Sequence, residues 1–94
     1  MAKEVSAAHI LVDTEKKALE IREMIYGGEK FSDMAKKYSN CPSKRSGGDL
    51  GWFSRGAMVP TFENAAFSGE KGAIVGPVKT DFGWHLIYIK DVKG

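Results

Sequence analysis

The stretch WHLIYIKDV, residues 84–92, decides the fold. Its central run HLIYI is apolar on both faces of an extended chain, a pattern typical of a strand that is covered on two sides. We therefore expect this segment to lie in the middle of a sheet. The run VSAAHILV, residues 5–12, is apolar on both faces as well and is predicted to be a second interior strand. Alternation along it gives one face the side chains of Val5, Ala7, His9 and Leu11.

Two weaker strand candidates complete the predicted sheet. Residues 49–54, DLGWFS, carry a glycine at their middle, which weakens a strand. Residues 74–79 are interrupted by Gly76-Pro77, and proline cannot donate to a strand ladder, so this segment is predicted to be an edge strand. The turn residues TDFG, 80–83, then lead into the central strand.

Three helices are predicted between these strands. The first follows Asp13-Thr14, a helix start, and ends at Gly27-Gly28. The second begins at Ser32, and the third extends from Pro60 to about Phe67. The loop between the second helix and the next strand, residues 39–48, has room for a short 3₁₀ turn. Because strands and helices do not alternate regularly, we predict an α+β fold, with helices packed on a small antiparallel sheet.

Composition bounds the class of protein. The 94 residues are 43% hydrophobic and 28% charged, as expected for one globular domain spanning residues 1–94. The net charge of +2 is too small for a dedicated nucleic-acid binder, and a single cysteine excludes an internal disulfide. No segment approaches the run of about 18 apolar residues that spans a membrane. The first residues lack the apolar stretch of a secretory signal, so we expect a cytoplasmic location.

The two histidines are the first candidates for chemistry. His9 and His85 each lie inside a predicted interior strand. If these strands are neighbours, the imidazoles can meet on one face and hydrogen-bond ring to ring, each fixing the orientation of the other. The alternative is that each is a separate core histidine with no relation to the other.

Cys41 is the second candidate, because it lies in a polar loop although cysteine usually behaves as a small buried apolar residue. An inert, half-buried thiol is the alternative. A metal site formed by Cys41 and the two histidines is not favoured, since their spacing matches no local zinc pattern and a fourth ligand such as Asp49 would be needed. We expect neither a metal nor a cofactor.

Two further groups of residues stand out. An apolar set in irregular surroundings is either ordinary core or the lining of a shallow cleft suited to a small flat ring such as that of proline; its members are Leu50, Trp52, Phe53, Met58, Val59 and Phe62. A basic set clusters around the loop 39–48 and is either a solvated surface or a weak contact for anionic lipid or nucleic acid; its members are Lys36, Lys37, Lys44 and Arg45.

Four blocks of the sequence resemble the single-domain parvulins, a family of peptidyl-prolyl cis/trans isomerases. The blocks are AHILV at 8–12, SNCPS at 39–43, GGDLGWFSRGAMVPTFENAAF at 47–67 and GPVKTDFGWHLI at 76–87. The resemblance covers residues 8–89 and implies a four-stranded antiparallel sheet surrounded by about four short helices. It also implies that no phosphate is needed in the substrate, because the basic loop of phosphate-directed relatives is replaced here by the short acidic segment Asp13-Thr14-Glu15.

The resemblance also implies roles for single residues. His9 and His85 correspond to the paired histidines, Thr80 to the hydroxyl that bonds them, and Cys41 to the active-site cysteine, which is aspartate in other members. Leu50, Met58 and Phe62 correspond to the lining of the proline pocket, and Phe82 stands near its rim.

The function expected from the residues and the resemblance together is isomerisation of Xaa-Pro bonds in client proteins, by a monomer that assists protein folding. The alternative is a non-catalytic peptide-binding or chaperone module that uses the same cleft. A thiol hydrolase using Cys41 and His85 is least favoured, because neither an oxyanion hole nor an orienting acid is visible in the sequence.

Overall fold

The computed structural model describes residues 2–94. Its elements follow the chain in the order β1 (Glu4–Val12), α1 (Glu15–Tyr26), α2 (Phe31–Tyr38), the 3₁₀ helix η1 (Pro42–Ser46), β2 (Asp49–Ser54), α3 (Pro60–Ser68), β3 (Ile74–Thr80) and β4 (Gly83–Lys93). The predicted α+β class is confirmed. Of the four short helices expected, three are α-helices within the described residues, and the fourth helical piece is η1.

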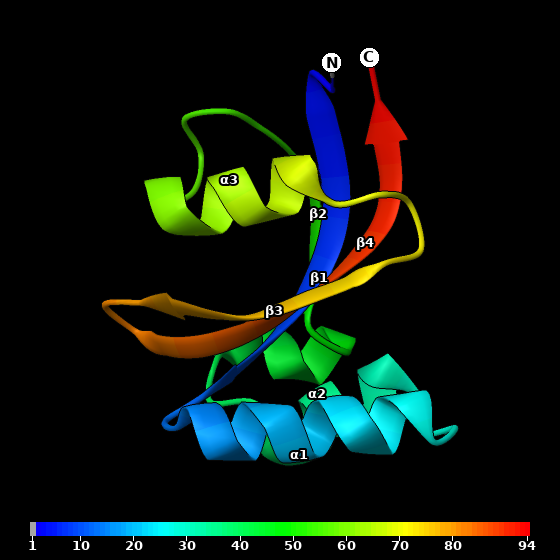
Figure 1. Ribbon diagram of the computed structural model, residues 1–94. Coiled ribbons are helices and arrows are strands. Elements are labelled where there is room, and N and C mark those ends of the chain that lie inside the picture. Colours follow the sequence, from blue (N-terminus) through cyan, green and yellow to red (C-terminus); the bar gives the residue numbers. More distant parts are fainter. Residues whose placement is uncertain (1) are drawn as a thin grey trace.

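The four strands form one antiparallel sheet in the order β2-β1-β4-β3. The interior positions predicted for the first and last strands are therefore confirmed, and the two strands are neighbours. The predicted edge position of β3, the strand that contains Pro77, is confirmed as well. In Figure 1, β1 and β4 run side by side along most of their length, with the two chain ends close together.

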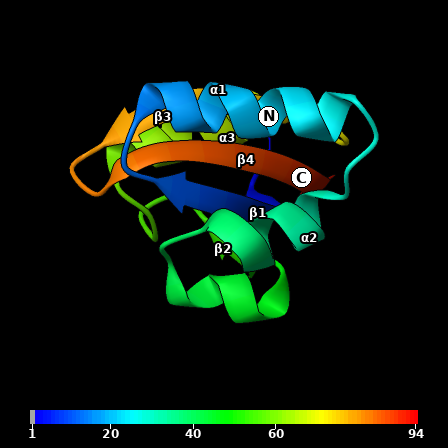
Figure 2. The same ribbon diagram turned by 90° about the horizontal axis from the view of Figure 1, so that it is seen from below.

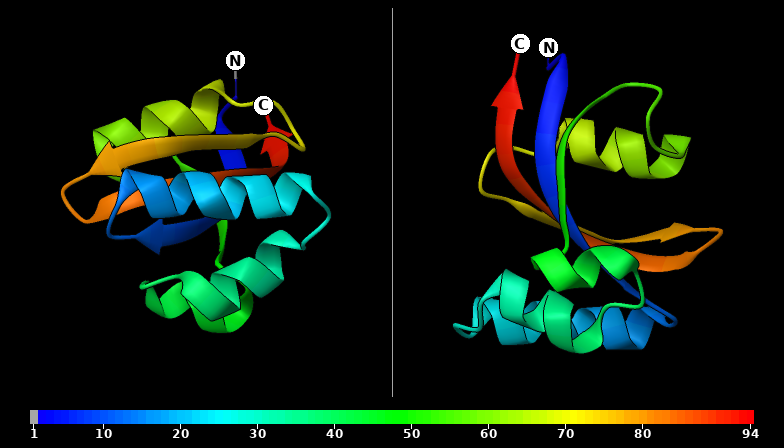
Figure 3. Two further views of the ribbon diagram at one scale, coloured as in Figure 1. Left: turned by 60° about the horizontal axis from the view of Figure 1, so that its bottom comes forward. Right: turned by 180° about the vertical axis from the view of Figure 1, so that it is seen from behind.

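Helices cover both faces of this sheet (Figures 1 and 3). α1 and α2 lie on one face, where the even-numbered side chains of β1, Ala8, Ile10 and Val12, are buried. α3 lies on the other face, against the odd-numbered Val5 and Ala7. The predicted alternation of faces along β1 is thus confirmed.

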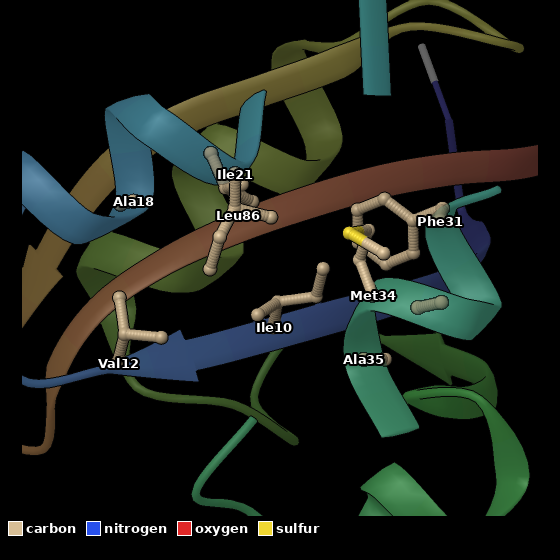
Figure 4. Close-up of a cluster of buried hydrophobic side chains, with 9 residues drawn as sticks. Ile10, Val12, Ala18, Ile21, Phe31, Met34, Ala35 and Leu86 are labelled. Carbon is tan, nitrogen blue, oxygen red and sulfur yellow. The ribbon is translucent and has the colours of Figure 1, made fainter. Parts of the chain in front are cut away.

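The core beneath α1 and α2 is built from aliphatic side chains together with Phe31 and Met34. Figure 2 shows α1 running alongside β4, the strand that carries the fully buried Leu86. Figure 4 shows the cluster, in which side chains of β1 and β4 meet those of the two helices; the labelled residues are Ile10, Val12, Ala18, Ile21, Phe31, Met34, Ala35 and Leu86. This packing holds one side of β1 and β4 rigidly, so that their other side can present functional groups.

Several boundaries differ from the predictions by one residue or a few. The Thr14 side chain caps α1 as expected, accepting the Lys17 N–H at 3.1 Å. α2 begins at Phe31 rather than Ser32, because the Lys30 carbonyl already accepts the Met34 N–H at 3.1 Å. β3 includes Thr80, which pairs with Gly83, so the turn before β4 is shorter than the predicted four residues.

Hydrogen bonds tie the segment between α2 and β2 to β1. The Leu11 N–H donates to Ser39 Oγ at 3.0 Å, and the Asn40 N–H donates to the Leu11 carbonyl at 2.8 Å. Farther along, the His9 N–H donates to the Gly48 carbonyl at 2.9 Å. These bonds hold the intervening Cys41 beside the strand that carries His9.

None of the helices described in residues 2–94 has the length and apolar character needed to cross a bilayer.

Candidate active site

A hydrogen bond joins the two histidines at the centre of the sheet. His9 of β1 pairs with Ile87, and His85 of β4 pairs with Leu11, so the imidazoles are diagonal neighbours on one face. Their Nδ1 atoms lie 3.0 Å apart, and the ring planes are inclined by only 18°. Both side chains are buried. The residues alone left this pairing open and the family resemblance implied it, and the structure confirms it.

Thr80 extends this pair into a row of three side chains. Its Oγ1 lies 2.7 Å from His85 Nε2 and accepts the Phe82 N–H at 3.2 Å. Since one of the two Nδ1 atoms must donate and the other accept, the row has two proton arrangements, which differ in whether Thr80 donates to His85 or accepts from it. In both arrangements the rings are neutral and keep each other's orientation.

Burial keeps the two imidazoles neutral. Desolvation, together with the nearby His85, lowers the pKa of His9 from 6.5 to about 4. Desolvation also lowers the pKa of His85. At neutral pH neither ring carries a charge, so the pair contributes hydrogen bonds and shape to the site, not an ionic group.

A hollow of about 490 Å³ opens above the pair on the side of the sheet that carries α3. Its apolar lining includes Leu50 of β2, Met58, and Phe62 of α3. Cys41 and both histidines line the same hollow. A small apolar ring with an adjoining polar group fits a hollow that is lined mainly by apolar side chains and by these few polar ones.

Phe62 connects the apolar lining of the hollow to the histidine pair. Its ring centroid lies 5.6 Å from that of His9 and 5.2 Å from that of His85, with interplanar angles of 85° and 77°. The side chain is almost fully buried, so its position is set by the packing of α3 on the sheet. The floor of the hollow and the histidine pair therefore form one packed unit.

The structure brings the eight residues singled out from the sequence to one place. Seven of them line the hollow; they are His9, Cys41, Leu50, Met58, Phe62, Phe82 and His85. Thr80 contacts His85 and lines an adjoining depression of about 380 Å³. Phe82, at the turn between β3 and β4, is 68% exposed, as a residue at the rim would be.

Other lining residues were not predicted as part of the site. They are Leu11, Asn40, Pro42 and Ala57, whereas Val59 belongs to the apolar set that the sequence offered as a possible cleft lining. Leu11 has the same parity along β1 as His9, and Asn40 and Pro42 flank Cys41, so strand alternation and sequence proximity were the available signals. Two members of the apolar set lie elsewhere: Phe53 is core beside Phe62 and Phe67, and Trp52 is exposed and lines no part of the hollow.

Charged side chains are absent from the described lining of the hollow, although Lys79 and Asp81 line the adjoining depression. No lysine or arginine is among its lining residues within the described chain; Lys36, Lys37, Lys44 and Arg45 lie on α2 and η1, and of η1 only Pro42 lines the hollow. An acid lies at its edge, because Asp13 Oδ1 accepts a hydrogen bond from the side chain of Asn40 at 3.1 Å. Within residues 2–94, no three histidine, cysteine, aspartate or glutamate side chains are grouped as metal ligands.

Known proteins share this fold and much of this sequence. Residues 3–91 match the family model described as "Rotamase: PPIC-type PPIASE domain". The chain is 49% identical over 88 residues to "Foldase protein PrsA" of Geobacillus kaustophilus, an alignment that covers 93% of this chain and 31% of that protein. The chain thus spans about a third of the length of this relative.

Solved structures agree with the sequence relatives. The crystal structure of the peptidylprolyl isomerase PrsA from Bacillus anthracis superimposes with a TM-score of 0.95 at 41% identity, over 99% of this chain and 43% of that one. The solution structure of NmPin, the parvulin of Nitrosopumilus maritimus, superimposes with a TM-score of 0.87 at 38% identity, over 97% of this chain and 99% of that one. A family model that matches nearly the whole chain, and a parvulin matched from end to end, show that this chain belongs to the parvulin family of peptidyl-prolyl cis/trans isomerases.

Proposed function

We propose that the chain catalyses cis/trans isomerisation of Xaa-Pro bonds in unfolded or partly folded client proteins. The observation that carries this proposal is the hollow itself, in which the apolar Leu50, Met58 and Phe62 lie together with Cys41 and the histidine pair. Family membership supports the reaction, and the name foldase, given to the relative from Geobacillus kaustophilus, supports a role in client folding.

The chemical problem is the partial double bond of the amide, which raises a barrier of about 18–20 kcal/mol to rotation. The twisted amide of the transition state is less polar than the planar one. Transfer from water to a dry apolar hollow therefore favours the twisted form relative to the planar form. No covalent bond is made or broken, so this mechanism needs no nucleophile.

The apolar and the polar lining residues have separate roles in this mechanism. Leu50, Met58 and Phe62 hold the proline ring by apolar contact, which leaves the preceding carbonyl to turn on the side of Cys41. The thiol tunes hydrogen bonding and local polarity on that side. His9 and His85 act beneath the site, where their mutual hydrogen bond keeps β1 and β4 in place.

We further propose that substrates need no phosphate before proline. The absence of lysine and arginine from the described lining supports this, and the Asp13 carboxylate at the edge would repel a phosphate dianion. Peptides with an apolar or neutral residue before proline should therefore be isomerised faster than their phosphoserine counterparts. A screen of Xaa-Pro tetrapeptides, with Xaa apolar, basic, acidic or phosphorylated, measures this preference.

The test of the reaction is a protease-coupled assay, in which the protease cleaves only the trans form of a proline tetrapeptide. We expect the purified chain to accelerate the slow cis-to-trans relaxation. Binding alone cannot do so, because a passive partner shifts populations without lowering the barrier. An unchanged relaxation rate, at concentrations where peptide binding is seen, would assign the hollow to a binding or chaperone module.

Weak contact with an anionic surface is a second candidate function. It is supported by the exposure of Lys36, Lys37, Lys44 and Arg45 on two helical elements that pack against each other. Such binding depends on charge and should weaken as salt is added. Binding to anionic vesicles that persists at high salt would contradict it.

We also propose that the protein acts as a monomer in the cytoplasm. Light scattering of the purified chain tests the monomer, and fractionation of the source cells tests the location.

A further inference from the structure

The connection between β2 and α3 forms part of the hollow yet has little structure of its own. This segment, residues 55–59, is called here the Met58 loop, and it supplies the lining residues Ala57, Met58 and Val59. Figure 3 shows the connection arching away from the sheet before it returns to the start of α3. Its backbone bond to β2, from the Ala57 N–H to the Ser54 carbonyl, is long at 3.4 Å. Another contact must hold the loop in position.

That contact is the carboxylate of Glu63, in the first turn of α3. Its Oε1 accepts the Gly56 N–H at 2.5 Å, and its Oε2 accepts from Arg55 Nη1 at 3.1 Å. The Glu63 side chain is only 15% exposed, so these charge-assisted bonds are partly shielded from water. The Arg55 guanidinium also lies 4.6 Å from the ring centroid of Phe67, which fixes it against α3.

The position of Glu63 links the loop to the floor of the hollow. Glu63 directly follows Phe62, whose ring contacts both imidazoles, and the Glu63 N–H donates to the Val59 carbonyl at 2.9 Å. The Met58 loop is therefore anchored at both ends to the first turn of α3, by the Glu63 carboxylate at Gly56 and by the Glu63 amide at Val59.

We propose that Glu63 is a positioning residue for substrate binding, which holds Met58 and Val59 against the proline ring. This inference rests on the proposed use of the hollow for proline. Without the carboxylate the loop would have to become ordered each time a peptide binds, and this ordering weakens binding. Once the proline ring is enclosed, the barrier to rotation is the same with or without the Glu63 carboxylate. Loss of the carboxylate should therefore change KM and peptide affinity, not kcat.

The test compares Glu63→Ala with Glu63→Gln in the full chain. Gln keeps an oxygen acceptor for the Gly56 N–H and loses the charge that pairs with Arg55, so it should rescue most of the defect. We expect Glu63→Ala to raise KM, and the Kd of a proline tetrapeptide in an NMR titration, by about tenfold, with kcat within about twofold, since a charged hydrogen bond has roughly this value. In Glu63→Ala the chemical shift of the Met58 methyl group should move toward the value of a mobile methionine side chain. Glu20→Ala, which removes the exposed Lys17 partner on α1, is the matched control and should change none of these values.

Three results would overturn the inference: an unchanged Kd in Glu63→Ala, a loss of kcat that follows the loss of melting temperature, or failure of Glu63→Gln to rescue. The peptide Kd and the Met58 resonances do not require turnover. If the wild-type chain proves inactive, the proposed reaction fails, while these two measurements still decide the role of Glu63.

Discussion

The Nδ1 atoms of His9 and His85 lie 3.0 Å apart, although 76 residues separate them along the chain. Each ring comes from a different interior strand, and Phe62 packs edge-on against both. Thr80 continues the row from the far side of His85. The floor of the hollow therefore depends on the register of β1 with β4, and a disturbance of that register should affect stability and activity together.

The buried histidines predict a loss of stability in acid. The unfolded chain binds a proton at His9 near pH 6.5, whereas the folded chain binds it only near pH 4, so the free energy of unfolding falls as the pH falls through this window. The His9 contribution alone should reach about 2 kcal/mol at pH 5 relative to pH 8. The lowered pKa of His85 acts in the same direction. Urea unfolding at several pH values between 8 and 5 measures the slope.

His9→Asn is the control for this prediction, because the amide can still hydrogen-bond to His85 but does not titrate. The slope of unfolding free energy against pH should become shallower in this variant. An unchanged slope would show that other groups cause the acid sensitivity.

Replacement of His85 by alanine should lower the melting temperature and the activity together. The variant loses the bonds to His9 and Thr80 and leaves a cavity under Phe62, at a cost of about 3 kcal/mol. Calorimetry and the protease-coupled assay, run on the same preparation, give the two values. Activity lost at an unchanged melting temperature would instead assign His85 a direct part in the chemistry.

Cys41→Asp and Cys41→Ala test whether the thiol attacks the substrate. Because rotation needs no covalent bond, both variants should keep activity within about tenfold of the wild type, which corresponds to about 1.4 kcal/mol in the barrier. Rates on one apolar Xaa-Pro peptide are sufficient for the comparison. Complete loss of activity in both variants, with peptide binding retained, would support an obligatory thiolate.

Phe82→Ala should change substrate preference without changing stability. The side chain is 68% exposed, so the free energy of unfolding should move by less than about 0.5 kcal/mol. A ring at the rim can cover a large apolar residue next to proline, so the rate should fall for Leu-Pro peptides more than for Ala-Pro peptides. Tyr26→Ala, at an aromatic residue that is 62% exposed and outside the hollow, is the matched control. Equal losses for both peptides would remove Phe82 from substrate selection.

Gly48 is predicted to tolerate no side chain. Its φ is +83°, and a Cβ there would collide with the carbonyl oxygen of His9. The two residues are close because the His9 N–H donates a hydrogen bond to the Gly48 carbonyl. Gly48→Ala should destabilise the fold by at least about 3 kcal/mol. Gly51 has a similar φ of +70° but open space around it, so Gly51→Ala should lose only about 1–2 kcal/mol. Chemical denaturation of the two variants measures their unfolding free energies, and the difference between them gives the cost of the collision beyond backbone strain. Equal losses of unfolding free energy would contradict the predicted collision.

The local patterns in the sequence were sufficient to predict most elements. Alternation along residues 5–12 correctly divided the side chains of β1 between two faces, because strand geometry makes neighbouring side chains point in opposite directions. Pro77 correctly marked an edge strand, because proline lacks the N–H that a central strand must donate. The boundaries at Phe31 and Thr80 were missed by one residue, since they depend on single backbone hydrogen bonds that composition does not reveal.

The sequence by itself determined the kind of most elements and the face of β1 on which each side chain lies, because periodicity is a property of neighbouring residues. Only the tertiary structure decided which buried residues touch. It separated Phe53, which packs in the core, from Leu50, which lines the hollow, and it placed the carboxylate of Glu63 on the Met58 loop. Contacts between distant residues depend on strand register and helix packing, and these result from interactions over the whole chain. No short sequence pattern therefore predicts such contacts.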